Sequence, residues 1–235
     1  MRIVLSLDSW PALRDFAGGD RSELGAAAAL AELAGVDSLR LSINEDLTPV
    51  RERDVDTLRR AARRFELRMP LSQNLLKIPL EARPDRVVLV GERHEATGAA
   101  PPIDARVAGA ALGGVLRALE EAGIPTSVRI APEVEAIRAV HALGVSDVEF
   151  FTGYLVDLPD TERRGALATL GDATRLASKL RLGIAIAGGL DDCNVADVLA
   201  AAPSAERVVF GHGLARRALL VGLDRAIRDF RARMR

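Results

Sequence analysis

Two glycine-rich stretches near the C-terminal end decide the fold: GIAIAGGL at residues 183–190 and VVFGHGL at residues 208–214. In each stretch, an apolar run typical of a buried strand ends in glycines and leads into a helical pattern. Unpaired amides at a helix start, together with the helix dipole, favour an anion. The two stretches therefore predict strand–helix units, with a phosphate seat formed by Gly189, Gly211 and His212.

Short apolar runs and longer amphipathic patterns alternate along the whole chain. The run Arg86 to Gly91 is the clearest, since its β-branched content is typical of a strand buried on both faces. The expected strands are Ile3 to Asp8, Leu39 to Ile43, Leu67 to Leu71, Arg86 to Gly91, Thr126 to Ile130, Val148 to Phe151, Gly183 to Ile186 and Val208 to Phe210. The expected helices are Glu23 to Ala34, Asp54 to Phe65, Gln73 to Glu81, Asp104 to Ala122, Pro132 to Leu143, Thr161 to Leu180, Asn194 to Ala201 and Leu214 to Arg233.

Eight strand-then-helix units in 235 residues predict a single α/β domain over residues 1–235, a (β/α)8 TIM barrel. A doubly wound parallel sheet is the alternative. In such barrels the active site lies at the carboxyl ends of the strands, and the loops after strands 7 and 8 often hold phosphate. Those are the two glycine-rich loops.

The composition narrows the class of function. A formal net charge of −1, with one Trp and one Tyr, argues against a nucleic-acid or anionic-membrane partner. No apolar run reaches the roughly 18 residues that a membrane helix needs. The single cysteine, Cys193, excludes an internal disulfide, and no Cys/His cluster has zinc spacing. We expect a soluble cytoplasmic protein without metal or organic cofactor.

Polar residues at strand ends are the candidates for chemistry. The period of two in a strand puts Ser6 and Asp8 on one face. Glu149 has apolar neighbours, which predict a raised pKa and an acid or base role; its pairing with Arg68 or Arg129 is the structural alternative. Candidate binding residues at the same end are Arg68, Arg129, Thr152 and His212.

Several motifs occur in one order from Ile3 to about Phe230: Leu7-Asp8, Ala34 to Asp37, Asn44 to Asp46, Glu52 to Val55, Leu89 to Arg93, Val148 to Gly153, Gly189-Leu190 with Asn194-Val195, and Gly211-His212. In this order they resemble the pyridoxine 5'-phosphate synthase family. These barrel enzymes condense 1-deoxy-D-xylulose 5-phosphate with 3-amino-2-oxopropyl phosphate. The resemblance implies a phosphate seat at Gly189, Gly211 and His212, a residue that stabilises the transition state at Glu149, and a homo-oligomer.

The chain departs from the family pattern at catalytic positions. The family's Asn-x-Asp-His motif is Ser6-Leu7-Asp8-Ser9 here, so that only the Asp is kept. The two proton-transferring histidines fall on Ser42 and Gly188, and the strand-three glutamate base falls on Arg68. Further differing positions are Ala17, Asn44 and Pro49. Because serine, glycine and arginine do not titrate near neutral pH, we expect a reaction other than the family's.

Three hypotheses follow. In the first, a diverged enzyme acts on a phosphorylated or otherwise anionic small molecule, with Asp8 and Glu149 as the acid/base pair and Arg68 and Arg129 orienting the anion. In the second, the chain is an inactive binding protein or scaffold, with a closed barrel mouth and Arg68 neutralising Glu149. In the third, it is an authentic pyridoxine 5'-phosphate synthase that uses substitute residues.

Overall fold

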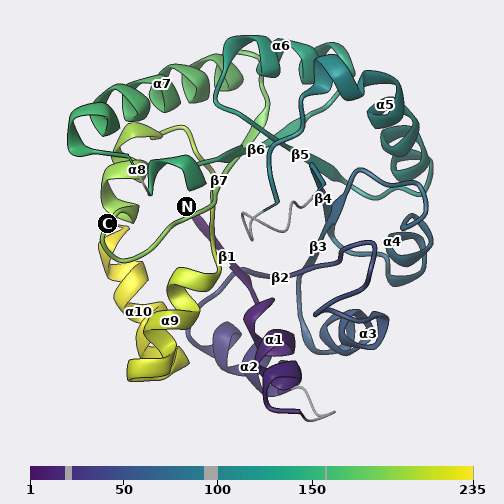
Figure 1. Cartoon of the computed structure of the whole chain (residues 1–235), viewed down its shortest axis with the longest axis vertical. Helices are drawn as coiled ribbons and strands as arrows, with labels where there is room; N and C mark the ends of the chain where they lie inside the picture. Colours follow the sequence, from purple (N-terminus) through teal and green to yellow (C-terminus); the bar gives the residue numbers. More distant parts are fainter. Residues whose placement is uncertain (19–22, 93–99, 157, 235) are drawn as a thin grey trace.

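The computed structural model describes residues 1–18, 23–92, 100–156 and 158–234. Within these residues eight parallel strands close into a barrel in chain order, and the last strand pairs with the first. Helices surround the strands on the outside (Figure 1). The expected (β/α)8 TIM barrel is confirmed. The doubly wound alternative is wrong, because it would leave two open sheet edges.

The strands are β1 (Arg2–Ser6), β2 (Ser38–Ser42), β3 (Phe65–Pro70), β4 (Arg86–Val90), β5 (Thr126–Ile130), β6 (Asp147–Phe151), β7 (Gly183–Ala187) and β8 (Arg207–Phe210). The helices are α1 (Ser9–Phe16), α2 (Leu24–Leu33), α3 (Glu52–Ala61), α4 (Lys77–Ala82), α5 (Ala105–Glu121), α6 (Val134–Ala142), α7 (Asp160–Lys179), α8 (Val195–Ala201), α9 (His212–Val221) and α10 (Leu223–Arg233), with a 3-10 turn η1 (Gly153–Leu155). Among the described residues, no helix has both the length and the apolar character needed to cross a membrane.

Two expected helices differ from the structure, and one observed helix was not expected. The single helix expected from Leu214 to Arg233 is two helices, because Gly222 has φ +83° and ends α9. The helix expected from Asp54 to Phe65 ends at Ala61, so β3 begins at Phe65 and includes Glu66. Helix α1 was not expected, since Pro11 lies inside a stretch of only eight residues.

The main apolar core lies between the strands and the surrounding helices. Leu39 and Leu41 of β2, like Leu67 of β3, are fully buried and belong to this one cluster. Residues of the opposite strand face point into the barrel, because successive side chains in a strand alternate. There the apolar content is smaller: one minor cluster joins Val4, Ala187 and Val209, and another joins Val88, Val90 and Ala100.

Charged side chains fill much of the barrel interior instead. The strand register sets Arg40 beside Glu66 and Arg129 beside Glu149. From the amino ends to the carboxyl ends of the strands, the ion pairs are Arg86 and Arg207 with Asp147, Arg40 with Glu66 and Glu149, Arg129 with Glu149, and Arg68 with Asp8. The barrel is therefore held together internally by arginine–carboxylate pairs.

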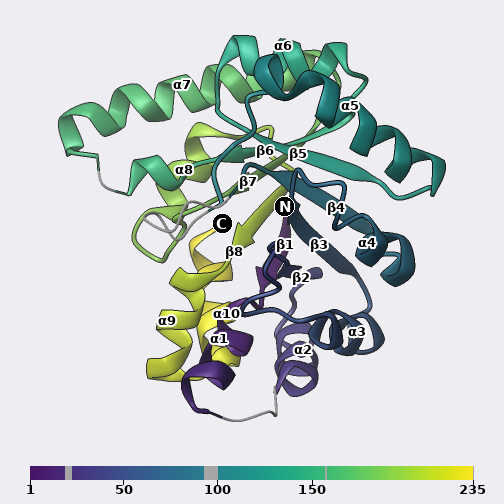
Figure 2. The same cartoon turned by 45° about the vertical axis from the view of Figure 1, so that its right-hand side comes forward.

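A separate buried ion pair fastens α1 to the barrel. Arg14 donates both bonds from Nη1 to the two carboxylate oxygens of Asp54, each at 2.7 Å, and Nη2 donates to the Pro49 carbonyl at 2.8 Å. Asp54 also accepts the Arg51 amide at the start of α3. Helices α1, α2, α9 and α10 gather on one side of the barrel, below the strands in Figure 2.

We predict that Asp54→Asn lowers the free energy of unfolding by about 2 kcal/mol, because it weakens the charge-assisted bonds to buried Arg14. Urea denaturation followed by circular dichroism measures the loss. Asp56→Asn is the matched control, since Asp56 is exposed on the same helix. Equal stability of the two variants would contradict the assigned role of the Arg14–Asp54 pair.

Candidate active site at the carboxyl ends of the strands

A cavity of about 690 Å³ lies where the strands end at their carboxyl side. Asp8, Arg68 and the loops after β7 and β8 line it together. A smaller cavity of about 110 Å³, next to Ser42 and Asn44, shares Asp8, Arg68 and His212 with it. We refer to the two together as the mouth. The closed mouth of the second hypothesis is therefore wrong.

The glycine-rich loops lie side by side in the mouth. A side chain at Gly213 would come within 2.3 Å of the Leu190 carbonyl oxygen, so the loops can approach only because Gly213 lacks one. Gly188 and Gly189 both have positive φ, at +105° and +65°. Helix α9 begins at His212, directly after Gly211, and its first-turn amides have no acceptor within the helix. By contrast, α8 begins only at Val195, so one helix start faces the mouth rather than the two expected.

Asp8 is the carboxylate that faces the mouth, and four donors hold it. The hydroxyls of Ser6 and Ser42 donate to its Oδ2 at 2.7 and 2.6 Å, and the Ser42 amide donates to Oδ1 at 2.7 Å. Arg68 completes the set through Nη2 at 3.1 Å. The Asp8 side chain keeps 15% of its surface exposed, so a ligand in the mouth can reach it.

The two candidate arginines, Arg68 and Arg129, differ in their exposure and in how many of their donors already have partners. Arg129 is buried; it donates to Glu149 from Nε and Nη2 at 2.8 and 2.7 Å, and to the Ala100 carbonyl from Nη1. Among the described residues Arg68 has one ion pair, to Asp8, and its side chain is 19% exposed. Burial and the nearby Arg129 guanidinium lower the pKa of Arg68 to about 10, which leaves it charged at neutral pH. Of these two arginines, Arg68 is therefore the one that a ligand can reach more readily.

Glu149 does not have the raised pKa that its apolar sequence neighbours suggested, and that expectation is wrong. Burial alone would raise its pKa, but the guanidinium groups of Arg40 and Arg129 lower it to about 2. Arg40 Nη1 donates to its Oε2 at 2.6 Å. The expected pairing with Arg129 is confirmed, whereas Arg68 pairs with Asp8 and not with Glu149. Glu149 is therefore a fully buried carboxylate that is charged at neutral pH.

The remaining predicted site residues fall into two kinds. Gly189, Gly211 and His212 line the mouth. Thr152 is buried, and its hydroxyl donates to the carbonyls of Ala187 and Gly188 at 3.2 and 2.7 Å, which fixes the loop after β7. The binding roles given to all these residues stay predictions.

The sequence analysis missed Arg40 and Glu66, which complete the charged interior. Arg40 Nη2 donates to Glu66 Oε2 at 2.7 Å. The signal was present in the sequence, since Arg40 lies two residues before Ser42 and Glu66 two before Arg68, on the same inward strand faces. Glu66 was missed because the expected helix ended at Phe65 and the expected strand began at Leu67, which left Glu66 between the two elements, whereas β3 begins at Phe65.

In the part of the chain that the structure describes, one group of side chains has atoms close enough to ligate a metal. Ligand atoms of Asp191, Asp192 and Cys193 lie within 4.8 Å of one another. Asp191 already accepts the amides of Cys193 and Asn194 and pairs with Arg216, contacts that are typical of a loop brace. The predicted absence of a metal or cofactor stays a prediction.

Fold and mouth together define a (β/α)8 barrel whose carboxyl-end cavity combines a helix start, an accessible guanidinium and a positioned carboxylate. A family model described as pyridoxal phosphate biosynthesis protein PdxJ matches residues 3–235. The chain belongs to this PdxJ family.

Curated relatives agree with the family. A protein of Geobacter metallireducens is 32% identical over 230 residues, which cover 97% of this chain and 96% of the relative. A protein of Synechococcus sp. strain CC9605 is 34% identical over 205 residues, covering 87% and 82%. Both are named pyridoxine 5'-phosphate synthase.

Solved structures support the fold alone. Thiamine phosphate pyrophosphorylase from Pyrococcus furiosus has a TM-score of 0.60 and 14% identity over 99% of this chain and 94% of its own. A structure titled 4-hydroxy-2-oxoglutarate aldolase has a TM-score of 0.62 and 16% identity over 100% and 94%. At these identities the shared property is the barrel.

We predict that Glu149 makes the fold sensitive to acid. Its pKa is about 2 in the folded state, against an ordinary value of 4.5, so its stabilising effect is complete above about pH 4.5 and is lost as the pH falls toward 2. Glu149→Gln should therefore be less stable at pH 7, and its free energy of unfolding should fall less steeply between pH 5 and pH 3.

Urea titrations at several pH values measure this slope. Glu206→Gln is the control, because Glu206 forms an exposed pair with Arg2 and its loss should leave the wild-type slope in place. A Glu149→Gln protein with the full wild-type slope would show that other groups cause the acid sensitivity.

Proposed function

We propose that the mouth binds a phosphorylated small molecule and that the chain is an enzyme acting on it. One observation carries the proposal: a single cavity is lined by the glycine loops with His212 at the start of α9 and by the Asp8–Arg68 pair. A helix start and a guanidinium both suit a phosphate, while the Asp8 carboxylate in the same cavity suits proton transfer. The active site of the domain over residues 1–235 is assigned to this end of the barrel.

The contacts support separate roles for the site residues. Gly189, Gly211 and His212 hold the phosphate, and Arg68 orients the negative group of the substrate. Asp8 is the acid/base residue, positioned by the hydroxyls of Ser6 and Ser42.

Glu149 is best assigned as a positioning residue. It has no exposed surface and two arginine partners, so its influence on a ligand passes through Arg129, which lines the mouth. Thr152 acts on the same principle, because its hydroxyl fixes the loop after β7. This departs from the acid/base pair of the first hypothesis, in which both carboxylates transfer protons.

For the reaction, we propose chemistry other than ordinary pyridoxine 5'-phosphate synthesis. Of the described residues that line the mouth, only His212 is a histidine, and it lies at the proposed phosphate seat. Ser42, Arg68 and Gly188 occupy the positions where the family resemblance places proton-transferring groups. None of these three can take over proton transfer at neutral pH.

A second candidate is the activity for which the relatives are named. Identities of 32% over 97% of the chain favour pyridoxine 5'-phosphate synthase, with Asp8 and its serines in place of the missing groups. Complementation of a pyridoxine auxotroph separates the two candidates. Growth would overturn the proposal of a different reaction, and failure to grow with a well-expressed, folded protein would support it.

We predict that Asp8→Asn abolishes turnover. Incubation of the protein with a set of phosphorylated metabolites, analysed by mass spectrometry, should reveal a conversion that falls at least about 100-fold in the variant. Glu45→Gln is the control, an exposed acid after β2. The proposal of an enzyme fails if the wild-type protein converts none of the set, and the role of Asp8 fails if Asp8→Asn retains turnover.

We also predict that His212→Ala weakens binding of inorganic phosphate at the mouth about tenfold, the loss of roughly one charge-assisted hydrogen bond. Isothermal titration calorimetry measures the affinity. His141→Ala on α6 is the matched control and should bind as the wild type does. Undiminished mouth binding in His212→Ala would remove this residue from the phosphate seat.

A cytoplasmic location and a homo-oligomeric state complete the proposal. Both are supported by membership of the family. Light scattering coupled to size-exclusion chromatography tests the oligomer, since a particle of 25.1 kDa would be a monomer.

A further inference from the structure

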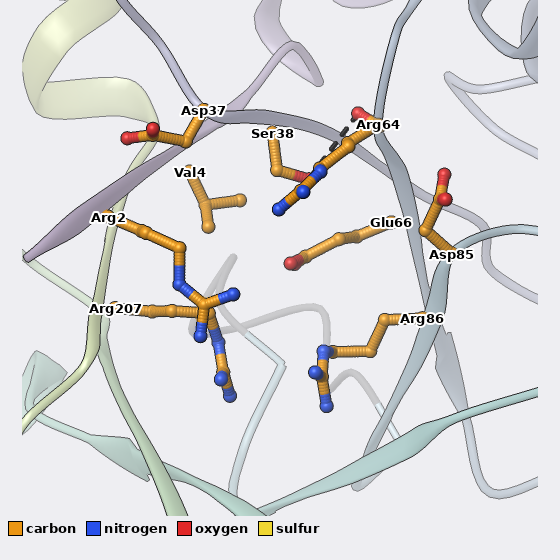
Figure 3. Close-up of a pocket in the computed structure, with 9 residues that line it drawn as sticks. All are labelled: Arg2, Val4, Asp37, Ser38, Arg64, Glu66, Asp85, Arg86 and Arg207. Carbon is orange, nitrogen blue, oxygen red and sulfur yellow. Dashed lines mark hydrogen bonds between the residues drawn. The ribbon is translucent and has the colours of Figure 1, made fainter.

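A second cavity, of about 270 Å³, lies at the opposite end of the barrel, where the strands begin. Four arginines line it: Arg2 of β1, Arg64 just before β3, Arg86 of β4 and Arg207 of β8. Figure 3 shows their guanidinium groups converging on the cavity from different strands. We call this the base cavity.

Two of the three carboxylates at the base cavity are turned away from it. Asp37 accepts the amide of Ile3 at 2.7 Å, and Asp85 accepts the amide of Phe65 at 2.8 Å. In Figure 3 both carboxylates point outward from the ring of arginines. They brace the strand starts. Arg86 and Arg207 pair with Asp147, and Arg2 pairs with Glu206 at the surface, so among the described residues Arg64 is the lining arginine without an ion pair.

Arg207 supplies a buried donor that has no acceptor. The residue is 3% exposed, and its Nη2 pairs with both oxygens of Asp147. Its Nε is buried and, within the described part of the chain, makes no hydrogen bond. An unmet buried N–H is uncommon in proteins, and a bound acceptor is one way to satisfy it. Arg86, which shares Asp147 with Arg207, is also partly buried beside this donor.

Arg64 adds a cation whose side chain has no ion-pair or hydrogen-bond partner among the residues that the structure describes. Figure 3 shows its guanidinium reaching over the base cavity. Its neighbour Arg63 behaves differently, since it pairs with Glu32 at 3.4 Å and does not line the cavity. Arg64 thus lines the base cavity, whereas the adjacent Arg63 forms its ion pair outside it.

Glu66 adds a hydrogen-bond acceptor to the base cavity, so a matching ligand should also carry a donor. Its Oε2 accepts from Nε and Nη2 of Arg40, while Oε1 has no donor among the described residues. The side chain points into the base cavity. A ligand with anionic oxygens for the arginines and one O–H for Glu66 matches the cavity, and hydrogen phosphate has both.

We propose that the base cavity is a phosphate site, distinct from the mouth, which binds inorganic phosphate or the phosphate group of a small metabolite. Arg64, Arg86 and Arg207 bind the anionic oxygens, Arg2 closes the outer side, and Glu66 accepts the phosphate O–H. The inference does not depend on the function proposed for the mouth, because the two cavities lie at opposite ends of the strands.

Crystals of the full chain soaked in sodium tungstate, a phosphate mimic with a strong anomalous signal, test the site directly. We expect an anomalous peak in the base cavity within hydrogen-bond distance of Arg64 and Arg207. Crystals of Arg64→Gln should lose that peak or show it weakened, while Arg63→Gln, the matched control, should retain it. A peak at the mouth without one at the base would overturn this inference and leave the proposed function intact. A peak at the base without one at the mouth would support this inference and count against the proposed phosphate seat of the mouth.

Calorimetry with inorganic phosphate tests the site in solution. Arg64→Gln should weaken one binding event about tenfold or more, whereas His212→Ala should weaken a different one. Arg64 is exposed, so this variant is expected to fold, and its melting temperature verifies that. Phosphate binding that is identical in the wild-type, Arg64→Gln and Arg63→Gln proteins would refute the base site.

Discussion

The arrangement of arginine–carboxylate pairs inside the barrel is the constraint on which the rest of the structure depends. A TIM barrel is ordinarily filled by bulky apolar side chains, yet this one buries Arg40, Arg129 and Glu149 completely or almost so. A buried charge without its partner is strongly destabilising, so each pair fixes the register of the strands that carry it. Glu149 holds the central place, because it joins β2 and β5 through Arg40 and Arg129.

Room for these long side chains comes from small residues on the neighbouring strands. Gly183 and Ala185 of β7 face inward beside Asp147 and Glu149. A side chain at Gly183 would come within 2.4 Å of the Asp147 carboxylate, so the glycine is required by its neighbour rather than by its own backbone. The apolar side chains that would fill an ordinary barrel lie instead between the strands and the helices.

The same charged interior reaches both openings of the barrel. At the carboxyl ends it presents Arg68 and Asp8 beside the start of α9, and at the amino ends it presents Arg86 and Arg207. Membership of the PdxJ family does not by itself decide the reaction, since a fold can support several chemistries. The chemistry rests on which groups meet in the mouth, where the hydroxyls of Ser6 and Ser42 hold Asp8.

The sequence by itself determined the eight strand–helix units, the barrel and the family, because local periodicity and glycine-terminated strands depend on short segments. It also placed Asp8, Arg68 and His212 at one end of the barrel. Only the tertiary structure decided what surrounds each charge. In the sequence, Glu149 has the apolar neighbours Val148 and Phe150, but their side chains point to the other face of the strand. Its pKa is lowered by Arg40, which lies 109 residues earlier in the chain, and by Arg129. Such pairings arise when the barrel closes, and strand periodicity alone cannot specify them.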